Sequence, residues 1–401
     1  MRKSLKNSIL LLLVCLLLSL WGCRSNAAPE ATPTPSIEAT PTPEPTPVPL
    51  NEALPLQLAA ELTDGDHSSW AVTFEGSGVI LESTERKIGS VYLEWESIPG
   101  QWKLTADGQT ILCGQNGYLH EYVELDAPAN YIVIETPAPL CDVYAFEPGS
   151  EIPDWVQIWH PALEKADLLL MPTHADDEHI FFGGMMPYYA GEKGYKVQVV
   201  YLTSHHWNNP VRSHELLDGL WTAGIRNYPV IGNFNDRYAD SLEVALERFD
   251  KTEILKFQVE MLRRFQPSVV IGHDLNGEYG HGVHILNAIS LTEAVTLAAD
   301  ATVFTDSANK YGVWDTPKLY LHLYPENEII MDWSVPLTAF GGTTALDVAR
   351  AGFACHESQQ GYFYVYGEGD AYDSRRFGLY RSTVGPDVQG GDVFENITSF
   401  Y

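Results

Sequence analysis

The chain has 401 residues and carries 53 acidic against 24 basic side chains, which gives a formal charge of −29 at pH 7. This length exceeds one average domain and allows two globular units, each with its own core. A surface this acidic repels phosphate backbones, which argues against nucleic acid as a partner.

Residues 1–22 have the pattern of an export signal. A basic start precedes an apolar run that is too short to span a bilayer. The sequence Leu20-Trp21-Gly22-Cys23 resembles the lipobox of bacterial lipoproteins, although Trp21 stands where a small residue is usual. The resemblance implies lipid on Cys23 and an extracytoplasmic protein anchored to the bacterial cell membrane. Ordinary cleavage near Ala27-Ala28 is the alternative.

Residues 23–50 form a low-complexity segment. Eight prolines from Pro29 to Pro49 alternate with threonine, glutamate and small residues. Such a composition cannot bury enough apolar area to fold. We therefore expect a semi-rigid tether that holds the rest of the chain away from the membrane.

Three cysteines remain if the signal is removed and Cys23 carries lipid, namely Cys113, Cys141 and Cys355. Export permits a disulfide between Cys113 and Cys141, but an odd count leaves at least one thiol unpaired. Buried free thiols are the alternative.

Residues 51–150 have the pattern of an all-β domain. Turn residues separate short apolar runs at residues 70–74, 91–95, 122–125 and 131–134. This spacing predicts a β-sandwich or jelly roll. The runs that start at Gly89 and Gly117 resemble discoidin-like domains, many of which bind sugars. The domain is predicted either to bind a glycan or to be structural, because Trp and Tyr on such strands also serve as core residues.

Residues 155–401 change to apolar runs that alternate with helical patterns. Candidate central strands lie at residues 167–172, 197–202 and 268–272, and candidate helices at 213–223 and 242–265. This alternation is typical of a parallel sheet that is covered by helices. We therefore expect an α/β domain with a Rossmann-like parallel sheet.

A histidine and three carboxylates follow the first candidate strand, in the run Thr173-His174-Ala175-Asp176-Asp177-Glu178. Ligands bind at the carboxyl ends of strands in an open parallel sheet, so these side chains occupy a favoured edge. A turn that brings His174 and Asp177 together supplies a nitrogen and an oxygen ligand for a metal ion, and leaves Asp176 to accept a proton from water. The alternative is an acidic loop that caps the next helix.

A second polar run follows the strand at residues 268–272. It reads His273-Asp-Leu-Asn-Gly277-Glu-Tyr279-Gly280-His281-Gly-Val-His284. If a helix starts at His281, then His281 and His284 share one face, so that one completes the metal site and the other points at substrate. Loops that follow two parallel strands converge on the same sheet edge. The sequence therefore predicts a mononuclear metal site with open positions for water and substrate.

The His-x-Asp-Asp-Glu loop, followed by Gly-Glu-Tyr-Gly-His-x-x-His, resembles the PIG-L/LmbE family of zinc-dependent N-acetylglucosaminyl de-N-acetylases. The resemblance covers roughly residues 165 to 395. It implies that His174, Asp177 and His284 bind Zn²⁺, although the ligand set also admits Fe²⁺.

The same resemblance implies roles for the catalytic side chains. Asp176 would be the general base, and Tyr279 would donate a hydrogen bond to the developing oxyanion. His281 would assist as an electrostatic stabiliser or a proton donor. Arg212, in an Arg-x-x-Glu motif, and Asp240 would contact the substrate, although an exposed salt bridge or a helix cap explains each of them equally.

Two positions depart from the family pattern. Ala175 stands where proline is usual, and Val283 stands where an aspartate that orients His281 is common. The expected reaction is removal of N-acetyl groups from an N-acetylglucosamine-type sugar at the cell exterior. Two alternatives remain, a catalytically inactive glycan-binding surface lipoprotein and a metal hydrolase of another amide or an ester.

Overall fold

The computed structural model describes residues 54, 56, 58–71, 78–206 and 208–398. The expected signal at 1–22, the lipidated Cys23 and the tether at 23–50 lie outside the described residues. The described residues from Leu54 onward belong to one compact unit. Within the described ranges, no helix is both long enough and apolar enough to cross a membrane.

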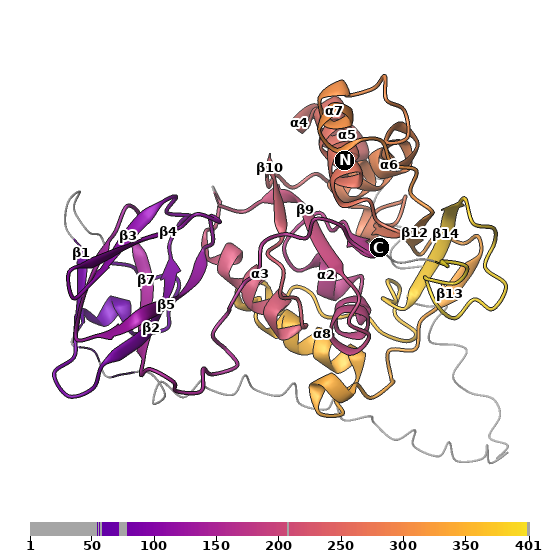
Figure 1. The fold of residues 1–401 in the computed structure, drawn as a ribbon. Coiled ribbons are helices and arrows are strands. Elements are labelled where there is room, and N and C mark those ends of the chain that lie inside the picture. The colour runs from indigo at the N-terminus through magenta and orange to yellow at the C-terminus, as the bar shows by residue number, and fades with distance from the viewer. Residues whose placement is uncertain (1–53, 55, 57, 72–77, 207, 399–401) are drawn as a thin grey trace, which may run out of the picture. The chain divides into compact units, whose positions relative to one another are not determined.

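Two antiparallel sheets make up the N-terminal β region, by which we mean the described residues between 54 and 146 (Figure 1). The strands are β1 Gly78–Glu82, β2 Ile88–Trp95, β3 Trp102–Ala106, β4 Gln109–Cys113, β5 His120–Ala129, β6 Tyr131–Glu135 and β7 Leu140–Phe146, and the short helix η2 is Ala60–Leu62. One sheet has the order β1-β6-β3-β4 and the other β5-β2-β7. Leu81 and Leu104 of the first sheet and Val91 of the second belong to one apolar core.

The strands predicted at 91–95, 122–125 and 131–134 are confirmed within β2, β5 and β6. The run at 70–74 extends into residues outside the described ranges and stays a prediction. The hairpin between β3 and β4 was not predicted, although Asp107 and Gly108 both have a positive φ and form the Asp-Gly turn that favours hairpins. Cys113, Cys141 and Cys355 are free thiols, so of the two alternatives the structure has the free thiols and not the disulfide between Cys113 and Cys141.

A seven-stranded mixed sheet lies at the centre of the α/β region, the described residues from 155 onward. Its strands are β8 Leu168–Leu170, β9 Val197–Ser204, β10 Val230–Asn235, β11 Val269–Gly272, β12 Lys318–His322, β13 Glu328–Ile330 and β14 Arg376–Ser382. Their order is β10-β9-β8-β11-β12-β14-β13. The first five strands of this order are parallel, as expected.

The two strands at one edge of this sheet correct the expectation of a wholly parallel sheet. β14 runs antiparallel to β12, and β13 runs antiparallel to β14. The chain reaches β14 through a non-helical segment at residues 360–375. The helix Ala345–Ala354 precedes this segment, but the long non-helical stretch after that helix lets the chain turn back, so the connection does not impose a parallel direction.

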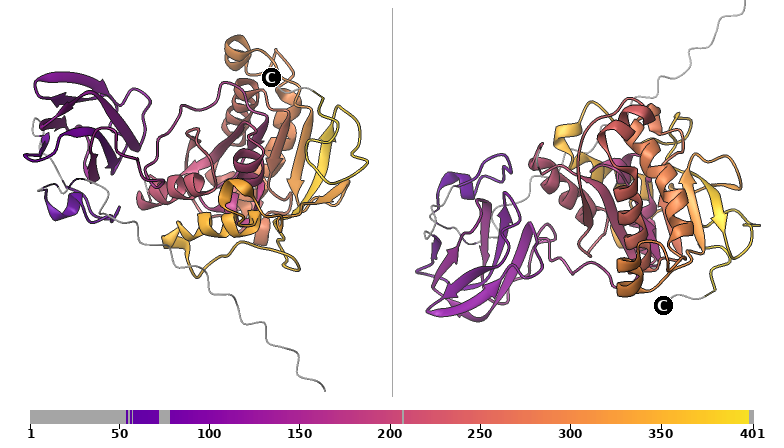
Figure 2. Two further views of the ribbon diagram at one scale, coloured as in Figure 1. Left: turned by 60° about the horizontal axis from the view of Figure 1, so that its bottom comes forward. Right: turned by 90° about the horizontal axis from the view of Figure 1, so that it is seen from above.

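Helices cover both faces of the sheet (Figure 1, Figure 2). They are α2 Asp177–Ile180, η3 Met186–Glu192, α3 Val211–Thr222, α4 Leu242–Arg248, α5 Lys251–Phe265, η4 Glu278–Gly280, α6 Gly282–Leu297, α7 Thr305–Tyr311, η5 Thr338–Phe340, α8 Ala345–Ala354 and η6 Glu357–Gln359. Leu168 and Leu170 pack into the same core as residues of α2, α3 and α8, whereas Leu169 packs into the core that holds residues of α5 and α6. Both faces of each central strand are therefore buried, which explains the uninterrupted apolar runs.

The helix predicted at 213–223 is confirmed as α3, but the one predicted at 242–265 is two helices. α4 ends before Phe249, which is extended, and Asp250 caps α5 by accepting a hydrogen bond from the backbone N–H of Thr252 at 2.7 Å. Aspartate favours this capping position, so a second helix starts there.

Candidate metal centre

The three predicted metal ligands come together at the carboxyl edge of the parallel strands. His174 lies in the loop after β8, Asp177 begins α2, and His284 lies in the first turn of α6. His174 Nδ1 and His284 Nε2 are 3.1 Å apart, and each is 3.3 Å from Asp177 Oδ2. All three side chains are buried. We call this triangle of His174, Asp177 and His284 the rim site.

The spacing of the rim site fits a tetrahedral metal ion. Bonds of about 2.0–2.2 Å place the ligand atoms of such an ion about 3.3–3.6 Å apart. The observed separations are 3.3 Å for the two pairs with Asp177, at the lower limit of that range, and 3.1 Å between the two imidazole nitrogens, slightly below it. Two imidazole nitrogens and a carboxylate oxygen are a common catalytic zinc set, which leaves a fourth position open. These residues could therefore hold one divalent ion.

Hydrogen bonds hold the loop after β8 in place. The Oδ2 atom of Asp177 accepts the backbone N–H of His174 at 2.7 Å and that of Thr173 at 3.2 Å. Asn287 on α6 donates to the hydroxyl of Thr173 at 2.9 Å, and Gln258 on α5 donates to Asn287 at 2.7 Å. The ligand loop is thus tied to two helices on one side of the sheet.

Glu278 supports the rim site from behind. Its buried carboxylate accepts hydrogen bonds from Nδ1 of His284 at 2.8 Å, of His273 at 2.9 Å and of His322 at 2.8 Å. Because His284 uses Nδ1 in this bond, its Nε2 lone pair is left for a metal ion. Sequence reasoning included Glu278 in the motif but gave it no role.

His273 also approaches Asp177, but it does not belong to the ligand set. Its Nε2 atom accepts the backbone N–H of Thr173 at 3.0 Å. An imidazole nitrogen has a single lone pair, so this contact uses the atom that would bind a metal. His273 therefore holds the loop and leaves the ion to the rim site.

Asp236 supports the rim site from the opposite side and was missed in the sequence. It follows β10, and its carboxylate lies 3.4 Å from Nε2 of His174 and 3.2 Å from Nδ1 of His205. Burial raises its pKa, but the hydrogen bond from His205 and the charges of His174, His205 and Arg212 outweigh burial and lower it. Its position at the carboxyl end of a parallel strand was the available signal.

The electrostatics of the rim site favour a cation. Burial lowers the pKa of His284, but the charge of Asp177 and hydrogen bonds to Asp177 and Glu278 outweigh burial and raise the pKa to about 10. Burial likewise raises the pKa of Asp177, and the neighbouring histidines more than reverse that effect. A divalent ion can take the place of the proton that these charges attract.

Asp176 does not belong to the rim site and remains available as a base. Its φ of 109° is rare for a residue other than glycine, and such strain is common at functional sites. Arg212 on α3 donates to Asp176 Oδ2 at 2.9 Å and also to the carbonyl of Ala175. Burial raises the pKa of Asp176 well above its ordinary value; Arg212 opposes the shift, while Asp177 and Glu178 add to it.

His281 lies just before α6 and not on its helical face, which corrects the expectation. Its Nδ1 atom caps the helix by accepting the backbone N–H of Val283 at 3.2 Å. The neutral ring therefore carries its proton on Nε2. Burial lowers the pKa of His281, as do the nearby charges of His174 and His284. Because a backbone group orients this ring, the departure from aspartate at Val283 leaves His281 supported.

Tyr279 lies in η4 with a φ of 48°, in the left-handed region that side chains rarely adopt. Burial and the charges of Asp177 and Asp176 raise the pKa of its hydroxyl, so Tyr279 stays a hydrogen-bond donor. Ala175 has a similar local explanation. Its backbone N–H donates to Nε2 of His205 at 3.1 Å, and a proline there would have no hydrogen to give.

A pocket opens over the rim site. Its lining residues are His174, Asp176, Asp177, Ile180, Phe181, Arg212, Asp236, Tyr238, Tyr279, His281, Gln359 and Phe363. The predicted residues His174, Asp176, Asp177, Tyr279 and His281 thus line one pocket together with Arg212, whereas His284 contacts them through the rim site without being a lining residue. Asp240 is exposed and is not among the lining residues, so its contact with substrate stays a prediction. Tyr238 and Gln359 were not predicted.

The rim site lies in a part of the chain that matches a known protein family. Residues 168–295 match the family model described as "PIG-L: GlcNAc-PI de-N-acetylase". This matched part of the chain contains the whole rim site.

Curated relatives match part of the chain. The 1D-myo-inositol 2-acetamido-2-deoxy-alpha-D-glucopyranoside deacetylase 1 of Catenulispora acidiphila is 29% identical over 188 residues, which are 40% of this chain and 56% of that protein. Deacetylase 2 of the same description from Saccharopolyspora erythraea is 28% identical over 185 residues, 40% of this chain and 66% of that protein. The chain thus spans 56–66% of the length of these two relatives.

One solved structure is similar to part of this chain. It is the N,N'-diacetylchitobiose deacetylase from Pyrococcus horikoshii, which is 18% identical. The match covers 48% of this chain and 71% of that one, with a TM-score of 0.38.

Proposed function

We propose that this chain is a metal-dependent N-deacetylase that hydrolyses the N-acetyl group of an N-acetylglucosamine-type amino sugar. One observation carries the proposal. Within the part of the chain that matches the PIG-L family model, three ligand atoms lie 3.1–3.3 Å from one another beside Asp176, a buried carboxylate that is not part of the ligand set. The deacetylase activity for which the curated relatives are named supports a sugar amide as substrate.

The residues of the rim site would hold the metal. A divalent ion bound there supplies an acidified water and polarises the amide carbonyl. We propose Zn²⁺ as the ion, because two histidines and a carboxylate suit it, and Fe²⁺ as the ion that the same ligands also accept.

The remaining chemistry belongs to side chains around the rim site. Asp176 accepts the proton of the attacking water, and its raised pKa makes it the stronger base for this step. Arg212 fixes the direction of that carboxylate through the bond at 2.9 Å. As the C–N bond breaks, the amine takes the proton that Asp176 received from the water, and acetate and a free amino sugar remain, while His281, whose ring is neutral, acts as an electrostatic stabiliser.

Two donors stand ready for the oxyanion of the tetrahedral intermediate. Tyr279 provides an O–H group, and His281 provides the Nε2–H that its helix-capping bond leaves outward. Phe181, Phe363 and Tyr238 provide ring faces against which the apolar side of a sugar can pack. We propose that Arg212 and Gln359 bind sugar hydroxyls, and that Asp240 reaches an outer hydroxyl.

We propose further that the enzyme works outside the cytoplasm. The support is the sequence alone, in which residues 1–22 resemble a lipoprotein signal and Cys23 follows it. Metabolic labelling with a fatty acid should label this protein in the membrane fraction of wild-type cells, and should not label the Cys23→Ala variant. Equal labelling of the two proteins would reject this anchor.

We also propose that the two antiparallel sheets of the N-terminal β region are the layers of a sandwich.

The activity is tested with the full-length protein loaded with Zn²⁺. Acetate release is followed with simple N-acetylglucosamine glycosides, chitin oligomers and muropeptides. We expect release from at least one of them, matched by an equal amount of free amine. Asp126→Asn is the matched control, because Asp126 is an exposed aspartate on β5, and it should keep full activity whereas Asp176→Asn should not.

Two outcomes would replace the proposal. If the protein binds zinc yet releases no acetate from any sugar, the inactive glycan-binding alternative is favoured. If it cleaves simple amides or esters far faster than all of the sugars, it is a metal hydrolase of another class.

A further inference from the structure

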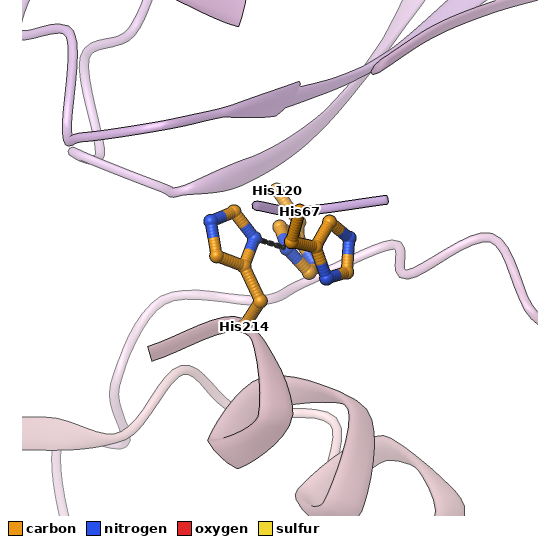
Figure 3. Close-up of side chains that lie close together, drawn as sticks. All are labelled: His67, His120 and His214. Carbon is orange, nitrogen blue, oxygen red and sulfur yellow. Dashed lines mark hydrogen bonds between the residues drawn. The ribbon is translucent and has the colours of Figure 1, made fainter. Parts of the chain in front are cut away.

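Three histidines from distant parts of the chain pack together away from the rim site (Figure 3). His67 lies before β1, His120 is the first residue of β5, and His214 lies in α3. We call His67, His120 and His214 the junction cluster. It joins the N-terminal β region to a helix of the α/β region.

The rings of the junction cluster are in direct contact. His120 Nε2 and His214 Nδ1 are 2.7 Å apart. His67 stacks on His214, with ring centroids 4.1 Å apart and planes inclined by 18°. One nitrogen from each ring lies within 4.8 Å of the other two.

His120 makes the kind of hydrogen bond that orients a metal-binding histidine. Its Nδ1 atom lies 2.9 Å from Oε1 of Gln157. Gln157 Oε1 also accepts the indole N–H of Trp159 at 2.9 Å, and the amide of Gln157 donates to Asp218 at 2.5 Å. Because Oε1 only accepts, His120 must donate from Nδ1, and its Nε2 lone pair faces His214. Metal-binding histidines are commonly held in this way by a bond to the other ring nitrogen.

The cluster also has an unsatisfied atom and an acidic surrounding. Nε2 of His214 is buried and has no hydrogen-bond partner. A buried polar atom of this kind calls for a water or an ion. Glu94 on β2 lies 3.0 Å from Nε2 of His67, and Asp218 lies 3.9 Å from Nδ1 of His120. Among the described residues, histidines are the only ion-pair partners of Glu94 and Asp218.

We propose that the junction cluster is a second site for a divalent transition-metal ion, which ties the N-terminal β region to α3. Imidazole ligands suit Zn²⁺, Ni²⁺ and Cu²⁺. A nearby carboxylate such as that of Glu94 compensates the positive charge of the ion. The side chain of His67 is 17% exposed, whereas those of His120 and His214 are buried. His67 therefore provides the way in, and it turns from Glu94 toward the other rings when an ion binds.

The role of this ion is structural. It lies in the junction, whereas the pocket residues lie at the carboxyl edge of the sheet. α3 links the two places, because Arg212 in its first turn reaches Asp176 while His214 belongs to the cluster. A metal at the junction therefore steadies α3 without touching the substrate.

The test is zinc binding by the full-length protein after removal of metal with a chelator and dialysis against Zn²⁺. Elemental analysis should find two ions per chain in the wild type and one in His284→Ala, which lacks the rim site. His67→Gln should also retain one, and the double variant none. His160→Gln is the matched control, because His160 is an exposed histidine outside the cluster, and it should retain both ions.

Thermal melting shows whether each variant is folded, so that loss of zinc through misfolding can be recognised. Zn²⁺ should raise the melting temperature of His284→Ala by several degrees and leave that of the double variant unchanged. Retention of both ions by His67→Gln, or no zinc and no thermal shift in a cooperatively folded His284→Ala, would overturn the proposal. A wild type with one ion that only His67→Gln removes would instead contradict the rim site, so the two failures are distinguishable.

Discussion

The rim site and the junction cluster use the same kind of ligand in different settings. In the rim site, the ligand atoms already lie 3.1–3.3 Å apart. Glu278 accepts a hydrogen bond from His284 on one side, and Asp236 lies 3.4 Å from His174 on the other. In the junction cluster, His67 is paired with Glu94 and has to turn before it can bind an ion. A site that performs chemistry needs its geometry in advance, whereas a site that ties two regions together can form as the ion binds.

The largest effect should separate chemistry from metal binding. Asp176→Asn keeps the shape of the side chain but removes the base, so we expect the turnover number to fall by roughly 10²–10⁴-fold. Zinc content should stay at the wild-type value, because Asp176 is not a ligand. Acetate release and elemental analysis on one preparation measure both quantities. Loss of zinc along with activity would contradict the separation of base from ligands.

The next effect concerns Glu278, the carboxylate that supports the rim site and has no counterpart in the test of the junction cluster. Glu278→Gln removes the charge that receives three histidine N–H groups, so zinc affinity at the rim site should fall by roughly 10–100-fold. Competition with a chelating dye in the His67→Gln background reports the rim site alone. Glu368→Gln serves as control, because the Glu368 side chain is 85% exposed. Equal affinities in the two variants would mean that Glu278 does not support the metal.

A smaller effect should come from the oxyanion donor. Tyr279→Phe removes one O–H group at the pocket, so the turnover number should fall by about 10-fold or more while zinc content stays constant. Steady-state kinetics separates this outcome from a change in KM alone. A change confined to KM would make Tyr279 a substrate-binding residue and not an oxyanion donor.

The smallest effect concerns the acidic surroundings of the junction cluster. Burial and the charge of Glu94 raise the pKa of Asp142 to about 7. Between about pH 4 and pH 7 the unfolded chain loses this proton while the native chain keeps it, so native stability falls as the pH rises. Asp142→Asn should therefore be more stable by about 1 kcal/mol at pH 8, with the gain vanishing near pH 4. Urea unfolding in a chelator measures it, and a gain independent of pH would contradict this cause.

Sequence and structure agree best where the signal is local. A metal site made by His174, Asp177 and one of two histidines was predicted because these residues follow two parallel strands in short motifs, and strand ends meet at one edge of a sheet. The family resemblance then selected His284 as the third ligand. The role of Glu278 was not predicted although His273 and His284 are near it in the chain, because the motif does not fix which side chains meet and its third partner, His322, is 44 residues away. The capping position of His281 depends on the φ and ψ angles around it, which the motif alone does not fix.

The junction cluster could not be predicted at all from the sequence. His120 and His214 are 94 residues apart, and their contact depends on how a strand of the N-terminal β region meets α3. No spacing rule connects such residues, because tertiary packing alone brings them together. The antiparallel strands β13 and β14 were missed for a related reason, since their pairing is set by the path of a long loop.

The central claim is that His174, Asp177 and His284 bind one metal ion. Anomalous scattering at the zinc absorption edge, from crystals of the full-length protein grown with Zn²⁺, tests it most directly. We predict a peak within bonding distance of His174 Nδ1, Asp177 Oδ2 and His284 Nε2. Well-ordered crystals with these three side chains in place and no zinc peak between them would contradict the account.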